Sequence, residues 1–526
     1  MNCRRKHRQK KKMGFYLMVS LAIFGVLVCR FFYVFWWRPM KLGRFIKDQG
    51  INGPPYWPMV GNMMEEARLK NEAKSRPMDL SHAIVPRVIP FLYQTFEYYG
   101  RSSMAWFGVN PRVTIMDPEL IREVFSNKEG HFEKTTLSPI FKVLVTGLVN
   151  HEGDKWVKHR RIINPAFHQE KLKRMFPAFH TSCCELMRKW EESVGSEGES
   201  CELDVWHEFQ NFTGDVISRT AFGSSYKQGM RIFQLQTEQA QLFSHSVKSV
   251  LIPGYRFLPI RVNKRRNEID KEVCALLRGM IKEREKEMKM GNVSSNDLLG
   301  LLMESNFRDS QEQGNSNAAA MTTEEVIDEC KLFYFAGQET TSVLLTWTMV
   351  ILSMHPNWQM KAREEVLQVF GKNKPDFDGL NHLKIVTMIL YEVLRLYPPV
   401  VYTVRRVAKT AKLGDITLPA GAQVSLPTLL MHHDPEIWGE DVEEFKPERF
   451  SDGVAKASKN RTVFFPFNWG PRICIGQNFA LIEAKMALAM ILQQFSFELS
   501  PSYAHAPFAA VTLQPQHGAQ IILHRH

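Results

Sequence analysis

The chain has 526 residues, of which 44% are hydrophobic and 23% charged, ordinary values for a globular protein. Its formal net charge of +12 is concentrated at the amino terminus, where positions 4 to 12 carry seven lysines and arginines. No basic tract interleaved with aromatic residues follows, so nucleic-acid binding is not expected. The eight cysteines include no CxxC pair and no Cys/His zinc spacing, which argues against a disulfide framework and against a zinc module.

The amino-terminal region predicts a membrane anchor. After a basic tail at residues 1–13, the 24 residues of 14–37 contain a single charge, at Arg30. About 20 mostly apolar residues cross a bilayer, and no small-residue cleavage site follows the run, so we expect a retained transmembrane helix rather than a cleaved signal peptide. Residues 38–62 are basic and proline-rich, which predicts a stiff linker before a catalytic domain at 63–526.

The charges that flank this anchor leave its orientation open. Lysine and arginine favour the cytoplasmic side, and seven precede the apolar run whereas four follow it, at 38–47. Translation from Met13 would remove the first seven and would place the body in the cytosol, a hypothesis that peptide mapping of the mature amino terminus tests. In the lumenal alternative, the sequons at Asn211, Asn292 and Asn460 would be candidates for glycosylation.

The body shows mainly a 3.6-residue hydrophobic period, which predicts a mainly α-helical domain with small β-sheets, an α+β class. We expect long helices at 168–193, 264–290, 322–354, 357–371 and 475–494. We expect short strands near 104–116, 412–427 and 509–524. The polar stretch 306–320 predicts a loop.

The helix expected at 322–354 has a polar centre with the sequence AGQETT. Gly337 costs about 1 kcal/mol relative to alanine inside a helix, which indicates that something approaches the backbone there. Glu339 and Thr340 place a carboxyl beside a hydroxyl, a pair that can pass protons to a bound reactant. The alternative is a locally solvated face whose threonine bonds back to a helix carbonyl. The residues alone do not decide between these readings.

Three charged residues predict a buried structural cluster. Glu392 and Arg395 are three positions apart in YEVLRLYPP, so they share one helical face and can pair. This spacing also occurs elsewhere in the chain, but here the sequence PERF follows at 447–450. Its Arg449 could complete a Glu–Arg–Arg group, because buried charges persist only when they are paired.

The sequence KWVKHRR, at 155–161, predicts a site for an anionic group. Trp156 and Arg160 stand at i and i+4, so that one helical face offers an indole N–H beside a guanidinium. Lys155 and Lys158 would point elsewhere and could dock an acidic partner. A solvated basic helix is an equally good explanation for those two lysines.

The sequence FNWGPRICIG, at 467–476, isolates Cys474 between glycines. A thiol near a helix amino terminus faces unpaired backbone N–H groups, which lower its pKa and favour the thiolate. A thiolate attacks a substrate or binds a metal. No histidine lies nearby in the sequence to serve as a base, although folding could supply one. Gly476 leaves the space over the sulfur free of a side chain, which suits a flat ligand.

Together these stretches resemble the cytochrome P450 family of haem-thiolate monooxygenases. The FxxGxRxCxG motif of the family matches in full at Phe467, Gly470, Arg472, Cys474 and Gly476. The family's WxxxR, AGxET, ExxR and PERF motifs occur in the expected order. The stretches GDKWVKHRRIINPAFHQEKLKRMFPAF and HHDPEIWGEDVEEFKPERF resemble the plant microsomal group that contains secologanin synthase and triterpenoid and gibberellin oxidases.

The resemblance implies a haem b cofactor whose iron takes Cys474 as its axial thiolate ligand. It implies proton delivery to bound dioxygen by Thr340 and Glu339, and a structural role for the cluster of Glu392, Arg395 and Arg449. The residues that it assigns to cofactor binding are Trp156, Arg160, Arg406, Phe467, Arg472 and Gly476. Adjacent to Arg406 stands Arg405, which leaves the alignment of that propionate contact open by one position.

The resemblance also implies partners and a location. An NADPH-cytochrome reductase would supply electrons, O2 the oxygen, and an apolar, terpenoid-like molecule the C–H bond, at the endoplasmic reticulum membrane with a cytosolic catalytic domain. The alternative is a haem-thiolate isomerase or dehydratase that acts on a peroxide without a reductase, but such proteins tend to lose the acid–alcohol pair present here. The segments implied to form the substrate pocket are 135–147, 227–260, 329–340, 400–404 and 509–514.

Overall fold

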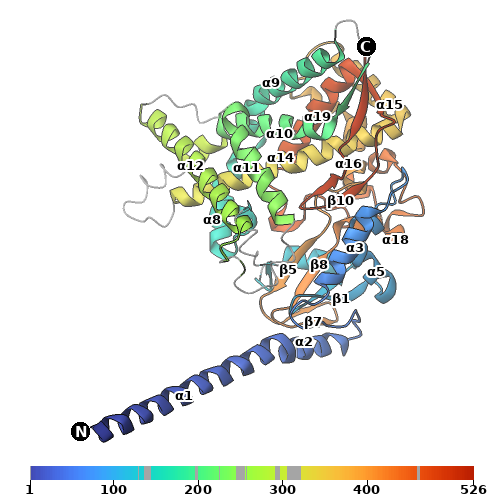
Figure 1. The fold of residues 1–526 in the computed structure, drawn as a ribbon. Coiled ribbons are helices and arrows are strands. Elements are labelled where there is room, and N and C mark those ends of the chain that lie inside the picture. Colours follow the sequence, from blue (N-terminus) through green and yellow to red (C-terminus); the bar gives the residue numbers. More distant parts are fainter. Residues whose placement is uncertain are drawn as a thin grey trace.

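The computed structural model has a mainly helical body, small sheets and one protruding helix (Figure 1). The residues that it describes are 2–127, 129–135, 144–195, 200–223, 226–244, 255, 258–290, 297–304, 321–458 and 462–526. Side chains are described from residue 12 onward, apart from those of 226–228 and 243–244. The loop predicted at 306–320 and the sequons Asn292 and Asn460 lie outside the described residues.

The long helices confirm the mainly α fold class. Each of the five predicted helices is present, with ends within three residues of those expected: α9 (Gln169–Val194), α12 (Arg261–Lys289), α14 (Thr323–Met354), α15 (Pro356–Phe370) and α19 (Gln477–Gln494). The remaining body helices with α labels are α3 (Met63–Ser75), α4 (Val85–Val88), α5 (Pro90–Tyr99), α6 (Pro118–Ser126), α8 (Gly153–Ile163), α10 (Val205–Phe222), α11 (Tyr226–Ser244), α16 (Lys384–Leu396), α17 (Thr428–His432) and α18 (Pro435–Trp438).

Helix α14 crosses the body and is buried along most of its length (Figure 1). Thr322 and Glu325 close its amino end as a capping box, and Pro356 begins the next helix directly after it. Helix α10 packs beside α14, and a Cβ at Gly337 would lie 2.8 Å from the side chain of Ile217. The glycine in the middle of α14 therefore makes room for α10.

Within the described residues, the strands form four small sheets. The largest has the order β1-β2-β8-β5-β3 and lies on the side of the body nearest the protruding helix (Figure 1). Its strands are β1 (Ser102–Phe107), β2 (Asn110–Ile115), β3 (Phe132–Lys134), β5 (Thr403–Val407) and β8 (Gln423–Leu426). The others pair β4 (Ser200–Asp204) and β9 (Phe495–Leu499) with β12 (Gln520–Arg525), β6 (Ala411–Leu413) with β7 (Ile416–Leu418), and β10 (Pro507–Ala509) with β11 (Leu513–Pro515). The sequence had indicated no strand at β3, β4, β5 or β9.

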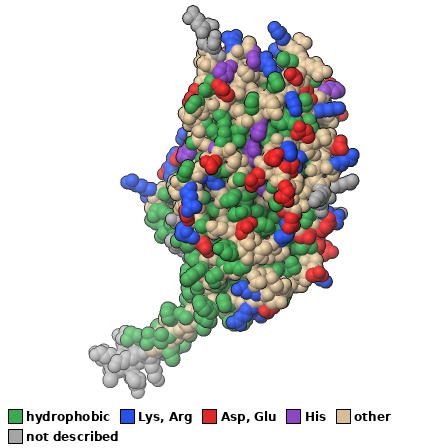
Figure 2. Space-filling model, turned by 90° about the vertical axis from the view of Figure 1, so that its right-hand side faces the viewer, with side chains coloured by type: hydrophobic (Ala, Val, Ile, Leu, Met, Phe, Trp, Pro, Cys, Tyr) green, Lys and Arg blue, Asp and Glu red, His purple; other side chains and the backbone are tan. Residues whose placement is uncertain are grey.

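The amino-terminal helix α1 (Asn2–Phe32) extends away from the body (Figure 1). It continues through a π-helical turn (Tyr33–Trp37) into α2 (Arg38–Lys47). Within the described chain, Lys12–Lys47 is the single continuous helix long and apolar enough to cross a membrane, and its most apolar stretch is not buried against the body. Figure 2 shows it as an apolar shaft below a body whose visible face mixes charges of both signs.

The segment predicted as a linker is folded onto the body. Ile46 of α2 is fully buried, and the Tyr56 hydroxyl donates a hydrogen bond to the carbonyl of Phe35 at 2.7 Å. A connector that contributes to the core cannot swing freely. The folded body therefore begins at α2, near Arg38, rather than at residue 63.

Candidate active site

The loop that precedes α19 holds Cys474 in a fixed backbone setting. The Cys474 N–H donates to the Phe467 carbonyl at 2.8 Å, which closes the loop. Gly470 has a φ of +72°, and a Cβ there would lie 2.7 Å from the Phe125 carbonyl oxygen. Only glycine accommodates both the left-handed backbone and this close approach. Helix α19 begins three residues beyond the sulfur, at Gln477.

Burial opposes the low pKa predicted for the Cys474 thiol. Burial raises the pKa of this thiol, although the backbone N–H of Gly476 and the guanidinium of Arg160 act in the opposite direction. A bound metal ion displaces the proton of a coordinating thiol outright. A Cβ at Gly476 would sit 3.9 Å from the sulfur, so a side chain there would crowd the cavity around Cys474. The setting thus suits a metal ligand with clearance above it better than a nucleophile that must ionise unaided.

An internal cavity of about 250 Å³ lies against Cys474. Helix α14 contributes Ala336, Gly337 and Thr340 to its wall. Most of the remaining lining is apolar and includes Leu148, Val149, Phe167, Ile217, Leu332, Phe333, Leu344, Leu394, Val400, Phe467 and Phe479. A cavity of this kind binds an apolar ligand and is polar at only a few points.

The residues predicted to bind an anionic group meet at one part of this cavity. Trp156, Arg160 and Arg472 all line it, together with the predicted residues Phe467 and Gly476. The Arg472 guanidinium lies 4.5 Å from the centre of the Trp156 ring and donates to the Glu152 carboxylate. Helix α8 and the Cys474 loop are far apart in the sequence, and their side chains thus meet beside Cys474.

Lys134 is a cavity residue that the sequence reasoning missed. It ends β3 opposite Arg405 on β5, and burial together with the charges of Arg405 and Arg472 holds its pKa well below the ordinary value. Such a buried surplus of positive charge calls for an anion. The two carboxylates of a haem would supply it. The register between two strands about 270 residues apart decides this proximity, so a local motif could not reveal it.

Arg406 does not reach the cavity, and this corrects the assignment made from the sequence. Successive side chains of a strand point to opposite faces. On β5, Arg405 is 3% exposed, and burial and the neighbouring Arg472 lower its pKa to about 10. Arg406 points the other way, where its guanidinium pairs with Glu133 at 2.5 Å. Arg405 shares a sheet face with its strand partner Lys134, which lines the cavity, and it lies near Arg472, although Arg405 itself is not in the described cavity lining.

Thr340 and Glu339 lie on different sides of α14. The Thr340 side chain lines the cavity, and its hydroxyl donates to the Ala336 carbonyl at 2.8 Å. Glu339 is buried, and its carboxylate accepts hydrogen bonds from the Thr512 hydroxyl at 2.6 Å and from the Gln514 amide. Burial raises the pKa of Glu339. Among the described residues, no hydrogen bond joins these two side chains, and the cavity lining includes Thr340 but not Glu339.

Glu392, Arg395 and Arg449 come together in the core. Glu392 and Arg395 are fully buried and form two parallel hydrogen bonds, both of 2.8 Å. Arg395 also donates to the carbonyls of His432 and Val442, at 2.9 and 2.8 Å. The Arg449 Nε lies 3.4 Å from the same Glu392 carboxylate. None of the three lines the cavity, among its described lining, which fits a structural role.

The basic face of α8 is partly neutralised. Lys155 forms an ion pair with Glu325 of α14 at 2.8 Å. This contact ties two helices together, so Lys155 offers less charge to a partner than the sequence suggested. Arg161, on the same helix, is exposed.

Two of the predicted pocket segments, 329–340 and 400–404, contribute to the cavity wall. The segment 509–514 supplies a hydrogen-bond partner of Glu339 instead. Parts of the other two predicted segments lie outside the described residues. Ile217 of α10 lines the cavity without having been anticipated, because only the packing of α10 on α14 brings it there.

The fold and the cysteine-centred cavity define a haem-thiolate protein class, and comparison with known sequences agrees. A sequence model described as "Cytochrome P450" matches residues 52–522. The chain therefore belongs to the cytochrome P450 family.

Individual relatives narrow this placement. The chain is 63% identical to "Cytochrome P450 CYP72A616" of Paris polyphylla, over 93% of this chain and 94% of the relative. It is 54% identical to "Cytochrome P450 72A15" of Arabidopsis thaliana, over 97% and 98% of the two chains. It is 53% identical to "11-oxo-beta-amyrin 30-oxidase" of Glycyrrhiza uralensis, over 97% of each. These matches place it in the plant CYP72A group.

Membership makes the chain a cytochrome P450 monooxygenase and implies a thiolate-ligated haem. The cavity fits that group. It offers a sulfur on its wall, a mostly apolar lining for a flat ring, and a buried cationic side for two carboxylates. When bound, the haem supplies the activation of dioxygen.

Proposed function

We propose that this monooxygenase inserts one oxygen atom from O2 into a C–H bond of a terpenoid, with triterpenoids as the first class to test. The observation that carries the proposal is the apolar wall formed around Thr340 by side chains such as Ile217, Leu332 and Leu344. Such a wall suits a substrate with few polar groups. The 53% identity with an oxidase whose name specifies an 11-oxo-beta-amyrin substrate supports the triterpenoid class.

In this proposal, residues of the chain have separate roles. Cys474 ligates the haem iron, and the surrounding apolar wall excludes water. Trp156, Arg160 and Arg472 would hold the propionates from the cavity wall, with Lys134 as a further cation there and Arg405 next to it. Thr340 moves protons at its hydroxyl oxygen, which can turn from the helix carbonyl towards the cavity.

The same proposal places the protein in the endoplasmic reticulum membrane, with α1 crossing once and the body in the cytosol. The exposed apolar stretch of the amino-terminal helix supports an anchor at residues 14–37. An NADPH-cytochrome reductase then delivers the electrons, as expected for a plant P450.

Spectral titration tests the substrate class. The haem-loaded, full-length protein is titrated with iridoid, diterpenoid and triterpenoid compounds, and the shift of the Soret band that follows displacement of the iron's water ligand is measured. We expect saturable shifts with triterpenoids and oxygenated products when reductase and NADPH are added. Saturation and turnover with iridoids or diterpenoids only would overturn the triterpenoid assignment.

A second comparison separates oxygenation from peroxide rearrangement. Turnover is measured with reductase, NADPH and O2, and independently with a lipid hydroperoxide alone. The monooxygenase requires the first mixture and incorporates labelled oxygen from 18O2. Product formation from the hydroperoxide alone, without label from O2, would indicate an isomerase or dehydratase.

A further inference from the structure

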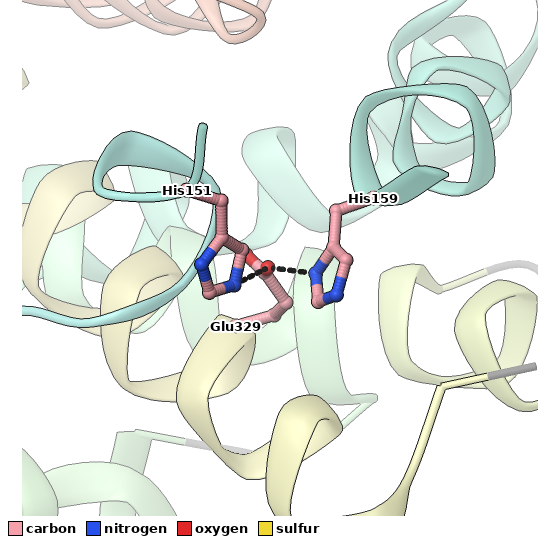
Figure 3. A group of neighbouring side chains, drawn as sticks. All are labelled: His151, His159 and Glu329. Carbon is pink, nitrogen blue, oxygen red and sulfur yellow. Dashed lines mark hydrogen bonds and ion pairs between the residues drawn. The ribbon is translucent and has the colours of Figure 1, made fainter. Parts of the chain in front are cut away.

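Three potential metal ligands meet outside the cavity, between α8 and α14 (Figure 3). His151 lies just before α8, His159 lies within it, and Glu329 projects from α14. One ligand atom from each residue lies within 4.8 Å of the others. Glu329 and His159 are fully buried, and neither they nor His151 belong to the described cavity lining, so the proposed oxygenation leaves the group unexplained.

The Glu329 carboxylate is held with one oxygen towards both imidazoles. Its Oε1 lies 2.6 Å from Nδ1 of His159 and 3.7 Å from Nε2 of His151. Its Oε2 accepts a hydrogen bond from the Leu148 N–H at 2.9 Å, which fixes the orientation. The backbone wraps closely around this oxygen, since a Cβ at Gly147 would sit 2.7 Å from it. Oε2 is thus anchored by the backbone, and Oε1, which is hydrogen-bonded to His159, faces both imidazoles, where an ion would replace the shared proton.

The imidazoles provide nitrogen ligands at the same point. The His151 and His159 rings pack edge to face, with their centres 4.4 Å apart. The Nε2 of His151 is buried and has no hydrogen-bond partner among the described residues. His151 as a whole keeps 14% of its side chain exposed, which gives an ion a way in from solvent.

A second carboxylate is placed to orient His159. Histidine that ligates a metal commonly donates its other ring N–H to a carboxylate, which fixes the tautomer. If Nδ1 of His159 binds the ion, its Nε2 carries the proton, and Glu325 Oε1 lies 3.6 Å away. Glu325 Oε1 also pairs with Lys155 at 2.8 Å, and the buried His159 Nε2 has no hydrogen-bond partner among the described residues. A small movement of the Glu325 carboxylate would let it accept a hydrogen bond from that N–H.

We propose that His151, His159 and Glu329 form a binding site for Zn²⁺. Two imidazole nitrogens and one carboxylate oxygen are a ligand set that zinc takes, with water in the fourth position. Zinc bonds of about 2.0–2.2 Å place tetrahedral ligand atoms about 3.4 Å apart. The observed separations from the Glu329 oxygen, 2.6 and 3.7 Å, lie on either side of that value, so small side-chain rotations close the site.

A bound ion would cross-link the two helices that frame the catalytic cavity. Helix α8 carries Trp156 and Arg160, and α14 carries Thr340, all of which line the cavity. Zinc at this site therefore stiffens the wall without touching the substrate. The inference rests on these side chains and not on the proposed substrate class.

Zinc binding is measured by equilibrium dialysis of the haem-loaded, tag-free, full-length protein in detergent, with metal analysis of both compartments. We expect one zinc per chain, and at least a tenfold weaker affinity in His151→Ala, which keeps the His159–Glu329 hydrogen bond and hence the fold. His207→Ala is the matched control, since this exposed histidine also stands 3.8 Å from a carboxylate, that of Asp204. It should bind zinc as the parent protein does.

Further measurements distinguish zinc bound by these three residues from zinc adsorbed non-specifically on the protein surface. Glu325→Gln should weaken zinc binding about 10- to 100-fold, the range for loss of an outer-shell partner. X-ray absorption at the zinc edge should show two imidazole ligands. In a separate measurement, added zinc should raise the melting temperature of the parent protein but not that of His151→Ala. Equal zinc content in the parent and His151→Ala proteins, or no zinc bound at 100 times the protein concentration, would overturn the site.

Discussion

Arg405 and Arg406 are neighbours on β5 with opposite environments: Arg405 is buried beside the cavity residue Lys134, whereas Arg406 pairs with the half-buried Glu133. We expect Arg405→Ala to release haem faster, because it removes a buried cation that would face a propionate. Loss of a hydrogen bond to a charged group costs about 1.5–3 kcal/mol, which corresponds to a tenfold or greater increase in the rate of haem release. Arg406→Ala is the matched control. Transfer of haem to an excess of a haem-scavenging protein measures both rates, and equal acceleration would contradict the assignment.

Thr340 and Thr341 of the AGQETT sequence both line the cavity, and the Thr340 hydroxyl donates to the Ala336 carbonyl. Thr340→Ala should retain haem and its spectrum but divert reducing equivalents from product to hydrogen peroxide, because in the proposed function protons are delivered through this hydroxyl. The ratio of NADPH consumed to product formed is the measurement.

Thr346 provides the control for that experiment. It lies on the same helix, is fully buried, and bonds back to the Ser342 carbonyl at 2.7 Å in the same manner as Thr340. It is not part of the described cavity lining. Thr346→Ala should therefore leave the coupling ratio unchanged, and equal uncoupling by both variants would attribute the effect to helix packing.

At the scale of elements, the buried Glu392–Arg395 pair fastens α16 to the segments that carry the His432 and Val442 carbonyls. Removing one partner of a buried pair costs about 3–5 kcal/mol, since the other charge is left unpaired. Glu392→Gln should therefore strongly reduce the yield of folded, haem-loaded protein and lower its denaturation midpoint.

The chain holds its own control for the ExxR spacing. Glu119 and Arg122 of α6 form an ion pair of 2.7 Å, but both side chains are about 60% exposed. Exposed pairs contribute about 0–1 kcal/mol. Glu119→Gln should shift the urea midpoint little, and a loss comparable with that of Glu392→Gln would show that spacing, rather than burial, decides stability.

Sequence reasoning was effective where a single element carries the information. Period and capping located α14 and the other long helices, and the local glycine pattern located the Cys474 loop. It was ineffective where distant segments meet. The approach of β3 to β5 decides that Lys134 lies at the cavity with Arg405 beside it, and that Arg406 faces Glu133 instead. That Glu339 and Thr340 point to different sides of α14 follows from local helix geometry. That Glu339 accepts a hydrogen bond from the Thr512 hydroxyl does not, because Thr512 comes from the far end of the chain.

At the scale of the whole molecule, the core contains neutral histidines. Burial lowers the pKa of His82, His432 and His433 to about 3 and that of His505 to about 4. The unfolded chain, with an ordinary pKa near 6.5, therefore binds more protons than the folded one as the pH falls from about 6.5 towards 4. Stability should decrease over this window, by on the order of 1–2 kcal/mol per histidine at pH 5.

Urea unfolding at pH 7.5 and 5.0, followed by tryptophan fluorescence, checks this expectation. In the fold, the His433 ring bonds to the Leu396 carbonyl at 2.9 Å, and a glutamine can keep that donor without titrating. His433→Gln should therefore reduce the loss of stability between the two pH values, whereas exposed His207→Gln should not. An unchanged loss in His433→Gln would remove this histidine from the explanation.

The packing of α2 against the body has a mechanical consequence. The helix runs without a break from α1 through the π-helical turn into α2. The Tyr56 hydroxyl donates a hydrogen bond to the Phe35 carbonyl within that turn. With residues 14–37 in a bilayer, as proposed, the continuous helix would hold the body in a fixed orientation relative to the membrane. Association with a reductase in the same membrane would then be a two-dimensional search in which the body already presents one of its faces. The orientational constraint that slows association in free solution would therefore be smaller.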